Sequence, residues 1–234
     1  MNNIMDIKNV SKNYGKKIVL DDISFSLSKG QIVGLFGSNG SGKTTLIKII
    51  TGLLSDYKGS VLIDNKEIGI ETKSVISYLP EKTYFNKNLN AKSIISIFND
   101  FYSDFNIDKA NDMLKNFSLS ENQKISTMSK GMQEKLQLVM VMSREAKLYI
   151  LDEPMGGVDP AARDYILDTI IKNYNENSSI LITTHLIQDV ERIFDKALFI
   201  KEGKIVINEY VDVLRDEKGK SLNEIFREVY KNVI

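Results

Sequence analysis

The amino-acid sequence predicts an α/β fold with a mainly parallel sheet, a β-rich N-terminal part and an inserted helical part. Short apolar runs separated by turn residues dominate residues 1–69, and the pattern becomes helical around residues 88–142. From Leu148 onward, short apolar strands alternate with amphipathic segments, as in a parallel sheet covered by helices. The two ends of the chain are therefore expected to form one α/β core.

The first strand–loop–helix unit of this core is expected to begin with a strand at residues 32–36. A loop rich in Gly and Ser follows, and then a helix with one apolar face. That face comprises Leu46, Ile49, Ile50 and Leu53.

A second unit begins with the apolar strand at residues 148–151. Asp159 and Pro160 supply an N-cap and a first-turn proline for the following helix, which leads to a strand at residues 180–182. The apolar residues of this helix are Ile166, Leu167, Ile170, Ile171 and Tyr174. Polar groups just past these strand ends are expected to gather at one edge of the sheet, where open α/β folds bind ligands. Further along, residues 204–234 are expected to form an edge strand and a closing helix that supports dimerisation.

The composition is typical of a soluble globular protein. The chain has 234 residues, 42% hydrophobic and 26% charged, and its lack of cysteine excludes disulfides and thiol-ligated metals. The first 12 residues lack the apolar block of a signal peptide, so the cytoplasm is the expected compartment. Because 31 basic residues balance 31 acidic ones without a basic block, we expect no nucleic-acid partner.

The loop after residues 32–36 has the spacing G-x-x-x-x-G-K-[ST] of a phosphate-binding loop. Its glycines allow a tight turn in which successive N–H groups converge on phosphate oxygens. Lys43 would contact the β- and γ-phosphates, and the Thr44 hydroxyl would ligate Mg²⁺. The predicted ATP-binding residues of this loop are Gly37, Ser38, Asn39, Gly40, Ser41, Gly42, Lys43, Thr44 and Thr45.

Two carboxylates and the single histidine of the sequence follow strands that should end at the same edge. Successive side chains on a strand point in opposite directions, so Asp152 would face Mg²⁺ while Glu153 aims at the attacking water as its polarising base. His185 directly follows a strand at residues 180–184, within reach of the γ-phosphate. Lys43, Glu153 and His185 are therefore the predicted catalytic residues.

A second candidate anion site begins the helix after Met128. Ser129 would cap this helix and Gly131 would permit close approach of a ligand. Because the chain already has one phosphate loop, this helix start is expected to serve the nucleotide held by another subunit.

The order of these motifs resembles the nucleotide-binding domain of ABC (ATP-binding cassette) transporters over essentially the whole chain. Tyr14 resembles the aromatic residue that stacks on adenine in that family. Asp159 matches the D-loop and His185 the switch histidine. The family's LSGGQ signature, which closes on the nucleotide of the opposite protomer, is matched by Ser129, Lys130, Gly131 and Met132.

Two positions depart from the family pattern. Lys130 and Met132 change the signature to MSKGM, which should alter nucleotide contacts. Glu81 stands where the family usually has a glutamine, and its carboxylate can ligate Mg²⁺ together with Thr44 and Asp152. The segments Tyr-Leu-Pro-Glu and Ser-Lys-Gly-Met resemble the ATPase subunits of bacterial ABC-2-type exporters.

The resemblance implies a P-loop NTPase core with an N-terminal antiparallel β subdomain and an inserted helical subdomain. Residues 1–234 would be one ABC ATPase domain, with residues 1–87 and 145–234 in the core and about 88–144 in the helical signature subdomain. It also implies ATP and Mg²⁺ as ligands, a second ATPase subunit as partner, and an integral membrane permease bound at the cytoplasmic face of the membrane.

Two other functions remain open from the residues. A soluble ABC ATPase, such as the iron–sulfur assembly type, would have a similar single cassette. A regulatory module would bind ATP but hydrolyse it poorly, which Glu153 and His185 argue against and the altered signature allows.

Overall fold

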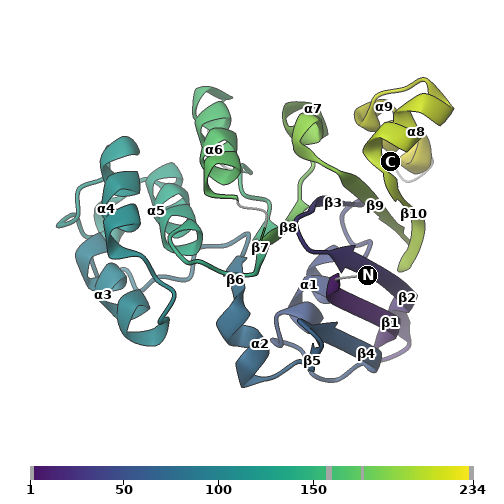
Figure 1. The fold of residues 1–234 in the computed structure, drawn as a ribbon, viewed down its shortest axis with the longest axis horizontal. Helices are drawn as coiled ribbons and strands as arrows, with labels where there is room; N and C mark the ends of the chain where they lie inside the picture. The colour runs from purple at the N-terminus through teal and green to yellow at the C-terminus, as the bar shows by residue number, and fades with distance from the viewer. Residues whose placement is uncertain (1–2, 157–159, 175–176, 232–234) are drawn as a thin grey trace.

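The computed structural model describes residues 3–156, 160–174 and 177–231. Among them lie two sheets, and Figure 1 shows that the N-terminal sheet and the helices α3–α5 occupy opposite ends of the molecule. The N-terminal sheet has the order β2-β1-β4-β5 and is antiparallel throughout. Its strands are β1 (Asn3–Tyr14), β2 (Lys17–Ser28), β4 (Lys58–Ile63) and β5 (Lys66–Glu67).

The core sheet has the order β10-β9-β3-β8-β7-β6. Its strands pair in parallel except for the edge strand β10, which pairs antiparallel with β9. The bounds are β3 (Ile32–Phe36), β6 (Ile76–Leu79), β7 (Leu148–Asp152), β8 (Ser179–Thr183), β9 (Lys196–Lys201) and β10 (Lys204–Tyr210). The antiparallel N-terminal sheet and the mainly parallel core sheet confirm the predicted fold class.

The central strands β3, β7 and β8 are buried along their whole length, as expected of parallel strands covered on both faces. On one face, Val33 and Leu35 pack with helix α1 (Lys43–Ile50), which lies between the core sheet and the N-terminal sheet. On the other face, Ile32 and Phe36 join an apolar cluster with the remaining core helices. This alternation along β3 holds the phosphate loop between two packed layers.

Three helices form the inserted part: α3 (Ala91–Phe101), α4 (Ile107–Asn116) and α5 (Lys130–Met142). A short 3₁₀ turn, η1 (Ile125–Thr127), precedes α5. The other elements are α2 (Ile70–Val75), α6 (Pro160–Asn173), α7 (Ile187–Val190), η2 (Glu191–Ile193), α8 (Val211–Lys218) and α9 (Leu222–Tyr230).

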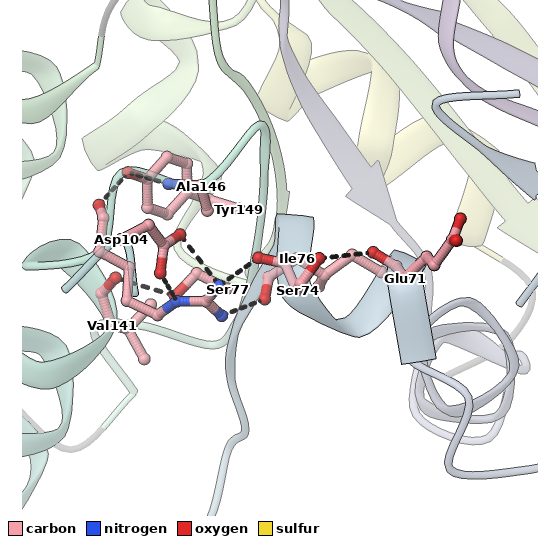
Figure 2. A network of polar contacts seen from close by, with 9 residues as sticks. Glu71, Ser74, Ile76, Ser77, Asp104, Val141, Ala146 and Tyr149 are labelled. Atoms are coloured by element: carbon pink, nitrogen blue, oxygen red, sulfur yellow. Dashed lines mark hydrogen bonds and ion pairs between the residues drawn. The ribbon is translucent and has the colours of Figure 1, made fainter. Parts of the chain in front are cut away.

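Arg144 links the helical part to the core. Figure 2 shows the network of polar contacts to which its partners Asp104, Ser74 and Ile76 belong. Its guanidinium group contacts both Asp104 carboxylate oxygens at 3.0 Å, and Asp104 lies between α3 and α4. It also donates to the carbonyl oxygens of Ser74 and Ile76, each at 2.5 Å, where α2 leads into β6. The ring of Tyr102 stacks on it, with 3.8 Å between Cζ and the ring centroid.

Three expectations about apolar residues and the C-terminal part were wrong. Leu53 is 64% exposed, because α1 ends at Ile50 and Gly52 turns the chain with a φ of 70°. Ile171 is also exposed, on the outer side of α6. Two helices, α8 and α9, follow the edge strand β10 where one was expected, because Gly219 ends α8 in a left-handed conformation.

Candidate functional site

In the loop between β3 and α1, the backbone conformation and the close packing leave no room for a side chain at two glycine positions. A Cβ atom on Gly37 would lie 2.4 Å from Ser41 Oγ and 2.7 Å from the carbonyl oxygen of Ile200. Gly42 has a φ of 112°, and a Cβ atom there would lie 2.8 Å from the carbonyl oxygen of Val19. The two outer glycines of the motif are therefore required by close packing, and the second also by its backbone angle.

Lys43 and Ser41 give this loop the polar groups that phosphate needs. Lys43 Nζ donates to the carbonyl oxygens of Gly37 and Ser38, at 2.6 and 3.2 Å. Burial lowers the pKa of Lys43, and the carboxylates at the cavity oppose this shift. Ser41 Oγ is buried and has no hydrogen-bond partner within the described part of the chain. A tight loop with a lysine and a spare buried hydroxyl fits an anionic phosphate.

Asp152 and Glu153 are tied to the neighbouring strand by Thr183. The register of β7 and β8 places Asp152 opposite Thr183. The Thr183 hydroxyl donates to Asp152 Oδ1 at 2.6 Å and accepts from the Glu153 N–H at 3.1 Å. Burial raises the pKa of Asp152, and the hydrogen bond from Thr183 opposes that rise. One hydroxyl thus positions both acidic residues.

Glu153 meets His185 directly. Glu153 Oε2 lies 2.8 Å from His185 Nδ1 and accepts a 3.3 Å hydrogen bond from the His185 N–H. Glu153 has a φ of 54°, a left-handed conformation that is strained for a residue with a Cβ atom. From this turn the Glu153 carboxylate reaches His185, just past the end of β8, while Asp152 contacts Thr183, the last residue of β8.

All six predicted catalytic and metal-binding residues line one cavity of about 920 Å³, namely Lys43, Thr44, Glu81, Asp152, Glu153 and His185. Asn39 of the phosphate loop and Lys130 of the signature segment line it as well. Thr44, Glu81 and Asp152 offer the oxygen atoms that Mg²⁺ prefers. Among the described residues no group of three or more Asp, Glu, His or Cys side chains is placed to hold a metal ion. This arrangement suits an ion that protein and substrate phosphates hold together.

The remaining predicted residues lie elsewhere. Tyr14 ends β1, is half exposed and does not line the cavity; Lys12 Nζ lies 5.0 Å from its ring centroid. Ser129 caps α5 as expected, since its Oγ accepts from the Met132 N–H at 3.2 Å. Asp159 lies outside the described residues.

Thr183 is a residue to which the sequence analysis gave no role, although it lies in the expected strand before His185. We expect Thr183→Val, which keeps the shape but removes the hydroxyl, to lower ATP turnover at least about tenfold, since hydrogen bonds to charged groups contribute about 1.5–3 kcal/mol. The Mg²⁺ concentration for half-maximal turnover should rise as well, because Asp152 loses its anchor. Steady-state assays over a Mg²⁺ series measure both. Thr183→Ser should restore most of the activity, and equal defects in both variants would contradict this role.

Known proteins share this sequence pattern and fold. A family model described as ABC transporter matches residues 20–156, more than half of the chain. The chain belongs to the ABC transporter family. The ABC transporter ATP-binding protein YtrB of Bacillus subtilis (strain 168) is 30% identical over 217 residues, which cover 92% of this chain and 74% of YtrB.

Two further comparisons cover almost the full length of both chains. The lantibiotic transport ATP-binding protein SrtF of Streptococcus pyogenes is 29% identical over 95% of this chain and 96% of SrtF. A solved ATP-binding subunit of an ABC transporter has a TM-score of 0.88 and 28% identity, over 96% of this chain and 98% of that chain. The chain is thus an ATP-binding subunit of the ABC transporter type, and the comparisons favour this function over the soluble non-transport alternative.

This ABC transporter subunit contains no helix, within the ranges that the structure describes, of the length and apolar character needed to span a bilayer.

Proposed function

We propose that this ABC transporter subunit hydrolyses Mg·ATP and thereby drives a separate integral membrane permease, as an exporter, from the cytoplasmic face of the cell membrane. The observation that carries the hydrolytic part is the Glu153–His185 contact in the cavity that Lys43 lines. The relative SrtF, named for lantibiotic transport, supports the transport part.

In this proposal Glu153 polarises the attacking water. Its Oε2 is engaged with His185, so Oε1 would accept the proton of water placed for in-line attack on the γ-phosphate. Lys43 would hold the β- and γ-phosphates, and His185 would stabilise charge near the γ-phosphate. Thr44, Glu81 and Asp152 would hold Mg²⁺, which neutralises phosphate charge when bound.

The signature segment supports a second ATPase subunit as partner. Gly131 is the second residue of α5, in the first turn after the Ser129 cap, and glycine is a poorer helix former than alanine. Apart from its chain neighbours and the backbone of its own helix, nothing in the described residues lies within 4 Å of a Cβ atom built at Gly131, so packing against the rest of the chain does not account for this glycine. We propose that Ser129, Lys130, Gly131 and Met132 approach the nucleotide of the opposite subunit, with Asp159 at the same interface and Tyr14 against the adenine.

A groove of about 540 Å³ between the helical part and the core is the proposed permease site. Aromatic side chains from both sides line it, among them Tyr78, Tyr84, Phe98 and Tyr102. An apolar segment of the permease would contact these rings. This arrangement also fits the proposed division into a core (1–87 and 145–234) and a helical signature subdomain (about 88–144).

The test is recovery of the partner from the membranes of the native host. Tagged Glu153→Gln protein is incubated with detergent-solubilised membranes and MgATP, and the proteins that copurify are identified by mass spectrometry. The same protein with no nucleotide added is the control. A multi-span permease enriched by MgATP would support the proposal. Recovery of soluble assembly factors or ribosomes alone would contradict it.

A further inference from the structure

The C-terminal helix α9 is held at both ends. At its start, the Glu224 N–H donates to Ser221 Oγ at 3.2 Å, and the Glu224 carboxylate accepts from the Ser221 N–H at 2.8 Å. In its last turn, the Val229 carbonyl oxygen accepts a 2.8 Å hydrogen bond from Lys201 Nζ, at the end of β9. The capping box stabilises the first turn of α9, and the Lys201 contact ties its last turn to the core sheet.

Tyr230, the last residue of α9, extends into the end of the core sheet. Its side chain is 3% exposed and its ring packs on Phe226, with 4.5 Å between the centroids. The hydroxyl donates to the carbonyl oxygen of Ile200 at 2.8 Å, and the carbonyl oxygen of Phe36 lies 3.3 Å away. A hydroxyl has one proton, so the two carbonyl oxygens share it. The shorter hydrogen bond, to Ile200, is the stronger one, and the longer hydrogen bond, to Phe36, is weaker.

The carbonyl groups of Phe36 and Ile200 both lie next to Gly37, the first glycine of the phosphate loop. The Phe36 carbonyl belongs to the peptide that enters the loop at Gly37. The Ile200 carbonyl lies against Gly37 from the neighbouring strand, close enough that a Cβ atom there would be 2.7 Å away. A shift of either carbonyl would therefore change where the loop begins.

We infer that Tyr230 is a positioning residue for the phosphate loop, because its hydroxyl fixes the two carbonyl groups that hold Gly37. The inference rests on the proposed binding of nucleotide by this loop. A loop fixed in its binding shape loses less conformational entropy when phosphate binds, so it binds more tightly. Burial raises the pKa of the Tyr230 phenol, so its hydroxyl keeps its proton at neutral pH.

Tyr230→Phe removes the hydroxyl and keeps the ring, which makes it the test. We expect Mg·ATP to bind about three- to tenfold more weakly, as for the loss of a neutral hydrogen bond. Amide hydrogen exchange in residues 37–45 should become faster in the nucleotide-free protein.

Tyr174→Phe is the matched control. Tyr174 also donates its hydroxyl to a backbone carbonyl, that of Gly30 at 2.5 Å, but near the other end of β3. We expect this variant to keep both the nucleotide affinity and the exchange rates of residues 37–45.

Unchanged exchange and affinity in Tyr230→Phe would overturn the inference, as would equal changes in both variants. If both variants lower the melting temperature equally and neither changes the exchange rates of residues 37–45, the Tyr230 hydroxyl contributes only to the overall stability of the protein. If the unaltered protein fails to bind Mg·ATP, the proposed function is contradicted, while the exchange rates of residues 37–45 still decide the role of Tyr230.

Discussion

Glu153→Gln is expected to lower ATP turnover by about 10²–10⁴-fold, the usual contribution of a positioned general base. Glutamine keeps the size of the side chain and can still contact His185, but it cannot accept the proton of water. The affinity for Mg·ATP should stay within about threefold, because ground-state contacts through Lys43 and Thr44 are retained. Single-turnover phosphate release and equilibrium nucleotide binding measure the two quantities separately.

Glu202→Gln is the matched control for this experiment. Glu202 is also a glutamate in a left-handed conformation, with a φ of 50°, and it directly follows a core strand, β9. It does not line the nucleotide cavity. The Glu202→Gln variant should hydrolyse ATP at the same rate as the unaltered protein. If the unaltered protein turns over no faster than Glu153→Gln, the chain is a regulatory module that binds ATP, and the proposed hydrolysis is wrong.

The parts of the fold that sequence patterns predicted well are those specified by short segments. The phosphate loop has its glycines and lysine within eight residues, and fully apolar runs such as residues 148–151 identify buried parallel strands. The predicted apolar face of α1 wrongly includes Leu53, because the spacing of apolar residues does not show that the chain turns at Gly52.

The parts that could not be predicted depend on contacts between residues far apart in the chain. Thr183 lies 31 positions from Asp152, and Tyr230 lies 30 positions from Ile200. A threonine in a strand or a tyrosine in a helix has no local signature for such a contact. These roles depend on which strands are neighbours in the sheet and on where α9 packs, and both are known only from the folded structure.

Arg144 is the clearest such case, since its partners Asp104 and Ser74 are 40 and 70 positions away. We expect Arg144→Met to lower the free energy of unfolding by about 3 kcal/mol, the low end for breaking a buried charged pair, because Arg144 is buried but Asp104 is a quarter exposed. Methionine fills much of the space but leaves the buried carbonyl of Ile76 and the Asp104 carboxylate without their donor. Urea unfolding followed by circular dichroism measures the loss.

The size of the loss in unfolding free energy shows whether Arg144 contributes more than an exposed ion pair does. Arg192→Met is the control, because Arg192 and Asp164 are both exposed and 3.9 Å apart, and its loss should not exceed about 1 kcal/mol. If Arg144→Met is too unstable to purify, Asp104→Asn should give a smaller, measurable loss, since the amide oxygen still accepts from Arg144. Losses below about 1 kcal/mol in both Arg144→Met and Asp104→Asn would show that the helical part holds to the core by apolar packing alone. The expected larger loss would mean that the contacts of one arginine with Asp104, Ser74 and Ile76 contribute much of the stability of the junction between the helical part and the core.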